Sequence, residues 1–283
     1  MAFLHESASD IVTEITPSNS WNLIDFKELW RYRDLLWILG MRDLKIRYQQ
    51  TIVGVAWAVI QPLTTMAIFA VLFGFLGKTP TDSTTPYYLV VFCALLPWQF
   101  VASSLAPAAT SIVTHQNMVQ KIYFPRIVLP LSAMISPLLD YLISLIVLAG
   151  MMWWCQTPIH LPILMVPVFM LMCILTTIGM SLWFAALSTT YRDFMYTIPF
   201  MIQIGFFLSS VIFETRAIVP EKYWIIIGLN PMVTVSEGMR WALLGAAPLP
   251  FTIWGPGVFM LSILLISGLA YFRRMEKYFA DRV

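Results

Sequence analysis

Residues 53–76 read VGVAWAVIQPLTTMAIFAVLFGFL, and residues 87–112 read YYLVVFCALLPWQFVASSLAPAATSI. Neither block contains Asp, Glu, Lys or Arg. A helix of about 20 apolar residues is long enough to cross a hydrocarbon core about 30 Å thick. Because lipid offers no partner to backbone polar groups, such a block crosses as a helix that bonds these groups internally. The two blocks therefore predict membrane-spanning helices.

Four further apolar blocks predict an all-α membrane protein with six spans. Of the 283 residues, 59% are apolar and only 11% are charged, whereas a soluble domain carries about a quarter charged residues. The net charge of +2 gives no reason to expect a nucleic-acid partner, and the three cysteines lack metal-ligand spacing. The predicted spans are Val53–Leu76, Tyr87–Ile112, Ile127–Trp153, Leu161–Leu187, Thr197–Phe213 and Phe251–Phe272.

Lys and Arg are unevenly distributed between the two sides that six spans define. Thirteen lie before the first span, in the second and fourth connections or in the tail, and four lie on the other side. The positive-inside rule then places both termini in the cytoplasm. The expected divisions are a polar tail without a signal peptide over residues 1–20, a separate helix over 21–40, the membrane domain over 41–272 and a basic tail over 273–283.

Two regions outside the spans are expected to form short helices. In residues 21–40, large apolar side chains including Trp30 and Trp37 share an arc of roughly 120° opposite charged residues, which predicts an interfacial amphipathic helix. A helix that docks a partner protein is the alternative, and the two are compatible. Residues 216–250 contain apolar runs too short to span, Tyr223–Leu229 and Trp241–Ala247, and these predict two short helices at the outer face.

Six motifs occur in register along the chain. They are RDLKIRYQQT at 42–51, VGVAWA at 53–58 with QPL at 61–63, KIYFPR at 121–126 with LP at 129–130, YRDF at 191–194, LNPM at 229–232 with RWALLG at 240–245, and FRRMEK at 272–277. From about Trp30 onward the chain resembles the permease subunit of type-2 ABC exporters for O-antigen, capsular polysaccharide and teichoic acid. One departure is SSVIF at 209–213, where an SPVIY-like run is expected.

The resemblance implies a homodimer joined to two ABC ATPase subunits in the bacterial inner membrane. The complex is expected to move a polyprenyl-linked polysaccharide outwards, most directly O-antigen, with capsular polysaccharide or teichoic acid as alternatives. ATP and Mg would bind to the partner, with no cofactor, metal or catalytic residue in this chain. The expected ATPase-coupling residues lie on the interface helix and in the loop after span two: Trp30, Arg31, Asn117, Gln120, Lys121, Tyr123, Phe124 and Arg126.

Several of these positions have a second interpretation. Lys121 and Arg126 are also explained as anchors of orientation. Arg42, Lys45 and Arg47 precede span one, where they either hold the pyrophosphate of the lipid-linked sugar or attract anionic membrane lipids.

Intramembrane residues supply the candidates for the conduit and the outer gate. A carboxylate at Asp140 is costly in lipid, so it either lines the conduit or accepts a sealing hydrogen bond. The aromatic conduit candidates, which lipid-facing packing also explains, are Trp57, Phe69, Phe73, Trp98 and Phe100. The resemblance assigns the outer gate to Tyr223, Trp224, Asn230, Pro231, Arg240 and Trp241.

Two other classes of function compete with a transport subunit. A membrane glycosyl or phosphoglycosyl transferase needs clustered acids or a metal site, whereas the acids here are dispersed and the three histidines are far apart. A secondary carrier commonly shows internal repeats around paired ionisable groups, and the sequence displays neither. The pattern favours the transport subunit.

Overall fold

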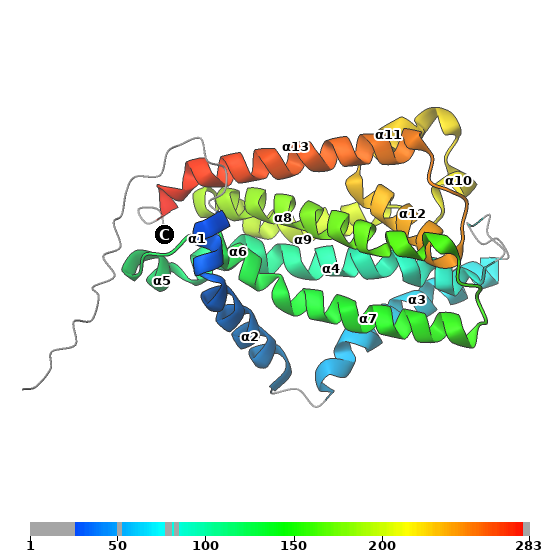
Figure 1. Cartoon of the computed structure of the whole chain (residues 1–283), viewed down its shortest axis with the longest axis horizontal. Helices are drawn as coiled ribbons and strands as arrows, with labels where there is room; N and C mark the ends of the chain where they lie inside the picture. The colour runs from blue at the N-terminus through cyan, green and yellow to red at the C-terminus, as the bar shows by residue number, and fades with distance from the viewer. Residues whose placement is uncertain (1–25, 50–52, 77–80, 82–84, 280–283) are drawn as a thin grey trace, which may run out of the picture.

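The computed structural model describes residues 26–49, 53–76, 81 and 85–279, and all regular structure in these residues is helical. Figure 1 shows the helices as a bundle with its long elements side by side. The predicted tail over 1–20 and the first residues of the predicted 21–40 helix lie outside the described residues. The elements are α1 Phe26–Arg31, α2 Arg33–Gln49, η1 Gly54–Ala56, α3 Trp57–Leu76, α4 Tyr87–Thr114, α5 Gln116–Lys121, α6 Val128–Ala133, α7 Ile135–Trp154, η2 Leu161–Met165, α8 Val166–Thr190, α9 Asp193–Leu208, α10 Thr215–Ile218, η3 Glu221–Tyr223, α11 Trp224–Gly228, α12 Pro231–Leu244 and α13 Phe251–Glu276.

The membrane-protein fold class is confirmed by the length and composition of the helices. Within the described residues, five segments are long and apolar enough to cross a membrane: Trp57–Gly74, Tyr87–Thr114, Val128–Trp154, Leu161–Thr190 and Phe251–Glu276. The apolar helix α9 has 16 residues, about 24 Å at the usual rise of an α-helix. A sixth crossing therefore stays a prediction that requires the residues after Leu208.

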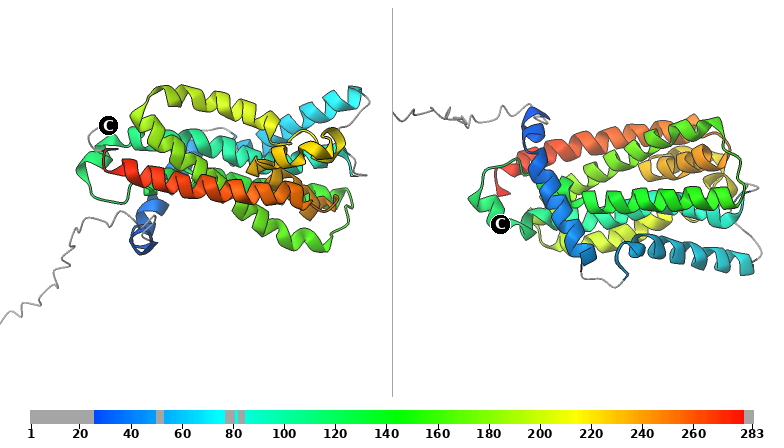
Figure 2. Two further views of the ribbon diagram at one scale, coloured as in Figure 1. Left: turned by 90° about the horizontal axis from the view of Figure 1, so that it is seen from above. Right: turned by 60° about the horizontal axis from the view of Figure 1, so that its bottom comes forward.

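The helix α4 occupies the centre of the bundle, which both views of Figure 2 show. Its residues Leu89–Ala94 are fully enclosed, and the aromatic ring of Phe100 stacks on Tyr141 of α7 with centroids 5.7 Å apart. Helices α3, α7, α8, α9 and α12 all pack against it. Small residues of α4 such as Ala94, Ser104 and Ala108 are completely buried, and small residues let neighbouring membrane helices approach closely.

The predicted third span is broken into α6 and α7 at Met134. Pro137 lacks the N–H that would bond to the Ala133 carbonyl one turn earlier, so the helix cannot continue through this point unchanged. The break lies where α2 packs across the bundle, and an added Cβ at Gly40 would lie 2.4 Å from the Ile135 side chain. The close approach of α2 and α7 thus depends on a glycine.

Helix α9, which corresponds to the predicted fifth span, ends at Leu208, five residues before the predicted end at Phe213. Ser210 adopts a positive φ of 51°, which interrupts the helix. The carbonyls of Val211 and Phe213 accept hydrogen bonds from the guanidinium of Arg240 at 2.7 Å and 2.8 Å. These carbonyls are therefore satisfied by a side chain instead of by helical N–H groups.

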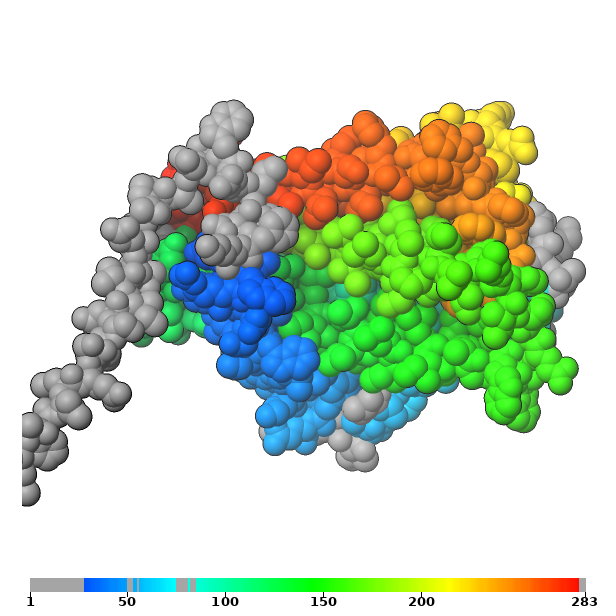
Figure 3. Space-filling model, viewed as in Figure 1, coloured from blue at the N-terminus to red at the C-terminus, as the bar shows by residue number. Residues whose placement is uncertain are grey.

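Short elements close the two ends of the bundle. Helix α2 lies obliquely across one end beside α5 and the C-terminal end of α13, and α10, α11 and α12 gather at the other end (Figure 1). Figure 3 shows α2 against the bundle and α13 running along its whole length. The predicted boundary at residue 40 falls inside α2, which continues to Gln49.

The segment between α9 and α13 contains α10, η3, α11 and α12, so it holds more helical elements than the two that the apolar runs predict. Helix α11 matches the first run, but α12 begins at Pro231, ten residues before the second run. Asn230 caps α12 by accepting a hydrogen bond from the Met232 N–H at 3.0 Å, and Gly245 ends it with a φ of 67°. An Asn-Pro start and a Gly end are standard helix boundaries, and these signals mark α12 better than its apolar run does.

Candidate functional site

The helices α3, α4 and α9 line an open cavity with a volume of about 450 Å³. Helices α3 and α9 lie on the same side of the bundle, along the upper edge in the left view of Figure 2. Small-molecule sites usually measure about 300–1,000 Å³, so the cavity is large enough for a sugar unit. Its lining residues are Arg47, Gln61, Thr65, Leu95, Trp98, Gln99, Ala102, Ser103, Ile202, Gln203, Phe206 and Phe207.

The cavity wall combines carboxamides with aromatic rings. Gln61, Gln99 and Gln203 come from the three different helices, and each carboxamide can donate and accept hydrogen bonds. The Trp98 ring lies 6.3 Å from the Phe206 ring, measured between centroids. Such a wall offers hydrogen bonds to hydroxyl groups and flat apolar surfaces to C–H groups.

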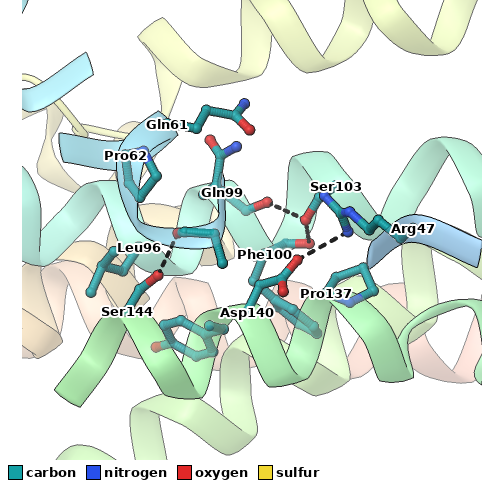
Figure 4. A pocket seen from close by; sticks show the side chains of 12 residues that line it. Arg47, Gln61, Pro62, Leu96, Gln99, Phe100, Ser103, Pro137, Asp140 and Ser144 are labelled. Atoms are coloured by element: carbon teal, nitrogen blue, oxygen red, sulfur yellow. Dashed lines mark hydrogen bonds and ion pairs between the residues drawn. The ribbon is translucent and has the colours of Figure 1, made fainter. Parts of the chain in front are cut away.

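Arg47 and Asp140, two separately predicted residues, meet beside this cavity. The Arg47 guanidinium lies 3.0 Å from the Asp140 carboxylate, and Figure 4 shows Arg47 extending across to α7. Tyr48 donates a hydrogen bond to the same carboxylate. Burial, together with this bond, raises the pKa of Tyr48 above its ordinary value, so the phenol stays protonated as a donor. Asp140 thus has an ionic partner supplied by α2 and not by another span.

The three basic residues of the predicted headgroup site do not converge on one point. Arg42 pairs with Asp43 at 2.8 Å and lies 2.6 Å from the His115 ring at the end of α4. Lys45 is exposed. Of the three, Arg47 alone lines the cavity, and it keeps 44% of its side chain exposed despite its ion pair. Arg47 is therefore the one suited to meet a charged group at the cavity.

The predicted ATPase-coupling residues divide into exposed and inward-facing sets at one end of the bundle. Phe124 is buried, and Arg126 bonds to Glu276 of α13. Two contacts connect the α1 region with the loop after α5. The Tyr123 hydroxyl lies 3.5 Å from the Glu28 carboxylate, and the Tyr32 hydroxyl lies 3.5 Å from the Tyr123 carbonyl oxygen. Burial beside Glu28 raises the pKa of Tyr123 above its ordinary value. The exposed set is Trp30, Arg31, Asn117, Gln120, Lys121 and Tyr123.

Most of the predicted outer-gate residues hold neighbouring parts of this chain together. Arg240 is completely buried. Asn230 donates to the Leu208 carbonyl at 3.1 Å, which joins the end of α9 to the start of α12. The indole of Trp224 donates to the Val219 carbonyl at 2.9 Å, and Trp241 packs edge-on against Phe169. Pro231 is buried, and Tyr223 is 46% exposed.

The aromatic conduit candidates lie in several different places. Trp98 lines the cavity, and Phe69 packs against Phe206 of its wall with centroids 5.8 Å apart. Phe73 packs against Tyr87, and Phe100 is buried against Tyr141. Trp57 is 51% exposed on α3. Of the five, Trp98 lines the cavity and Phe69 packs against its wall.

Sequence reasoning missed four residues that the structure places at these sites. Gln61, Gln99 and Gln203 are uncharged, and a search of the spans for ionisable or aromatic residues passes over them. A count of carboxamides within apolar blocks would have found them, since amides are also costly in lipid. Glu276 lies in the recognised FRRMEK motif, but no sequence pattern connects it to Arg126, 150 residues away.

Among the described residues, no three His, Cys, Asp or Glu side chains lie close enough to share a metal ion.

The chain is similar to export permeases and to a polysaccharide transport protein. The chain is 28% identical over 250 residues to the O-antigen export system permease protein RfbA of Klebsiella pneumoniae, which covers 88% of this chain and 94% of the relative. The RfbA protein of Myxococcus xanthus is 28% identical over 217 residues, 76% of this chain and 82% of the relative. The polysialic acid transport protein KpsM of Escherichia coli is 25% identical over 246 residues, 84% and 92% of the two chains.

The sequence profile of the ABC-2 type transporter family matches residues 34–244, which contain the cavity, the exposed residues beside α5 and the short helices up to α12. This match covers most of the chain, and the protein belongs to the ABC-2 type transporter family.

Proposed function

We propose that two copies of this chain form the membrane channel of a bacterial inner-membrane exporter for polyprenyl-linked polysaccharide, most directly O-antigen. Two ABC ATPase subunits, which bind ATP and Mg, would drive export from the cytoplasmic side, where both termini of this chain lie. Family membership and the names of the relatives support a polysaccharide transport subunit. The observation that carries the proposal is the cavity between α3, α4 and α9, with its carboxamides and aromatic rings.

A sugar chain matches the chemistry of this cavity. Pyranose rings present hydroxyl groups at their edges and C–H groups on their faces, and Gln99 and Trp98 are adjacent partners for the two. Polar side chains that face lipid are costly, and Gln61 and Gln203 are both exposed in the single chain. A second copy that covers α3 and α9 removes these side chains from lipid and encloses a polar path.

An ATPase can dock where the exposed residues surround α5. Lys121 and Tyr123 extend outward, while Phe124 anchors the loop in the core of the same end. A docking loop with an exposed face and a buried anchor transmits force to the helices that hold it, in this case α4 and α13.

The first test is partner-dependent ATP hydrolysis. The chain is co-expressed with a candidate ABC ATPase and reconstituted in phosphatidylethanolamine–phosphatidylglycerol vesicles, as wild type and as the double variant Lys121→Ala, Tyr123→Ala. We expect the chain alone to be inactive and the wild-type complex to hydrolyse ATP. The double variant should lose the co-purified partner or its coupled activity.

The matched control is Glu221→Gln, an exposed change at the opposite end of the bundle. It should leave both partner binding and hydrolysis at wild-type levels. Co-purification and hydrolysis that are indifferent to the double variant would remove the docking assignment and return attention to a carrier or a membrane transferase.

Capsular polysaccharide is the second candidate substrate, because the KpsM proteins are similar over most of this chain. The cavity lining favours a neutral glycan, since Arg47 is its one charged residue among those described and is paired with Asp140. Loss of one class of surface glycan in a strain that lacks this chain would separate the two substrates.

A further inference from the structure

The two ends of α13 contact the two regions that an exporter must coordinate. The helix has 26 residues, about 39 Å at the usual rise of an α-helix. Figure 1 shows it running from the end that holds α5 to the end that holds α11.

At the first end, Glu276 binds the loop that follows α5. Its carboxylate accepts a hydrogen bond from the Arg126 backbone N–H at 3.1 Å, and its backbone carbonyl accepts one from the Arg126 guanidinium. Arg273 pairs with the second carboxylate oxygen at 3.1 Å. With 17% of its side chain exposed, the carboxylate is shielded enough for these charged hydrogen bonds to hold the loop firmly.

An apolar cluster reinforces this junction. Phe272 packs edge-on against Phe279 with ring centroids 5.3 Å apart, and both rings are buried. Val119 of α5 and Phe124 of the loop belong to the same cluster. A displacement of α5 therefore cannot leave α13 behind without opening a packed core.

At the second end, α11 and α12 are seated against the first turns of α13 with no spare room. A Cβ at Gly228 would lie 2.7 Å from the Ile253 carbonyl oxygen. Thr234 of α12 donates a hydrogen bond to the same carbonyl at 3.2 Å. A Cβ at Gly257 would lie 2.0 Å from the Thr234 hydroxyl. Contacts this close make α11 and α12 follow any movement of α13.

Between its ends, α13 is attached to α8 along one side. The rings of Trp183 and Tyr271 stack with centroids 4.5 Å apart, and the Trp183 indole donates to Ser267 at 3.0 Å. The opposite side is open, since Phe259 and Ile266 are 63% and 57% exposed. The central helix α4 also runs between the two ends, but most of its residues are buried among neighbouring helices. Of the two, α13 has more freedom to move.

We infer that α13 transmits movement from the α5 loop to the short outer-end helices α11 and α12, with Glu276 as the positioning residue at the driven end. This inference rests on the proposed docking of an ATPase at α5. Sub-ångström shifts at a docking site can be amplified through packed elements, because packed cores switch between arrangements instead of deforming continuously.

The test measures an ATP-dependent change at the far end. Ile226 of α11 is 63% exposed and is replaced by Cys in a Cys155→Ser background, because Cys93 and Cys173 are buried. The labelling rate with a membrane-impermeant maleimide is measured in the reconstituted complex, with and without ATP and with vanadate. Glu276→Ala is compared with Arg274→Ala, a neighbouring exposed position.

We expect wild type and Arg274→Ala to show the same ATP-dependent change in labelling rate. In Glu276→Ala the change should shrink at least about fivefold, the lower end of ordinary coupling between sites, while the co-purified ATPase and its hydrolysis persist. Glu276→Gln keeps an oxygen for the Arg126 N–H and should retain part of the change.

Thr234→Val tests the same path from its other end. This near-isosteric change removes the bond to Ile253 without touching the docking region, and it too should shrink the ATP-dependent labelling change. If Glu276→Ala fails to assemble with the ATPase, the result for Thr234→Val tests the transmission along α13 by itself. An undiminished labelling change in Thr234→Val and in any assembled Glu276→Ala overturns the inference. A wild-type chain that retains no ATPase instead refutes the docking proposal itself.

Discussion

Arg240, which lies in the RWALLG motif, binds backbone carbonyl groups of two other segments. Its guanidinium donates to the carbonyls of Val90, Val211 and Phe213 and lies 3.2 Å from Glu237. Glu237 in turn accepts from the N–H and hydroxyl of Thr215, both at 2.7 Å. The proposed gate at this end is therefore held in shape by one cation whose donors are all directed inward.

The first prediction concerns the loss of this cation. Arg240→Ala leaves three carbonyls without this donor and Glu237 without its cation, and breaking a buried charge pair costs about 3–5 kcal/mol. Arg240→Lys should also destabilise the protein, because an ammonium group lacks the planar fork that reaches several carbonyls. Thermal unfolding in detergent checks both, and Arg216→Ala at an exposed position serves as the control. A midpoint equal to wild type in Arg240→Ala would contradict this assignment.

The second prediction separates headgroup binding from structural pairing at Arg47. Arg47→Ala removes a cation from the cavity but also leaves Asp140 unpaired, so the double variant Arg47→Ala, Asp140→Asn is needed. If Arg47 meets the pyrophosphate, both variants should lower substrate-stimulated ATPase activity more than basal activity. Asp140→Asn alone should spare the stimulation.

The structural alternative at Arg47 gives a different pattern. If pairing with Asp140 is its whole role, the double variant should recover what the single variant loses. An equal loss of basal and stimulated activity would likewise count against headgroup binding. The readout is the ratio of the two rates in reconstituted complexes.

At the scale of the helices, the crossing of α13 with α8 depends on glycine. A Cβ at Gly268 of α13 would lie 2.7 Å from the backbone oxygen of Gly179 on α8. Because this neighbour is backbone and not a flexible side chain, the two helices must separate to admit a methyl group. Small residues permit such approaches between membrane helices.

The third prediction follows from that contact. Gly268→Ala should lower the unfolding midpoint and be destabilising by about 1–3 kcal/mol, the usual cost of overpacking. Gly150→Ala in α7 is the matched control, since an added Cβ there meets nothing within 4 Å and alanine favours the helix. Both midpoints are measured in the same detergent, and equal shifts of the same sign would refute the packing argument.

At the scale of the whole molecule, α3 and α9 leave a face that a single chain does not cover. Phe200 and Ile204 of α9 are 62% and 42% exposed, and the polar cavity opens beside them. Exposed Phe and Ile side chains can face lipid tails, so their exposure alone does not require a partner. Carboxamides find no hydrogen-bond partner in lipid tails, and a second copy that covers them would remove this cost.

The fourth prediction places the dimer on this face. Single cysteines at Phe200→Cys and Ile204→Cys should give disulfide-linked dimers in native membranes when a mild oxidant is added. Ile146→Cys on α7, where Ile146 is 72% exposed, should stay monomeric because that side faces lipid. Cross-linking at residue 146 with none on α9 would move the interface to α7.

Local patterns account for the fold class and for most helix positions. Apolar blocks identify the spans, Asn230-Pro231 and Gly245 mark the ends of α12, and the motif order identifies the family. Each of these signals lies within one helix and its caps, where backbone hydrogen bonding and hydropathy act over a few residues. The sequence by itself therefore predicts the fold class, most helix positions and the family.

The partnerships at the candidate sites belong to the tertiary structure alone. Arg126 meets Glu276 and Arg240 meets Val90 across 150 residues each, and Arg47 meets Asp140 from a different helix. Hydropathy determines that a helix lies in the membrane but not which way it faces, because one apolar neighbour replaces another at little cost. Side-chain fit at crossings such as Gly40–Ile135 and Gly268–Gly179 decides the facing, and with it the cavity and the path along α13.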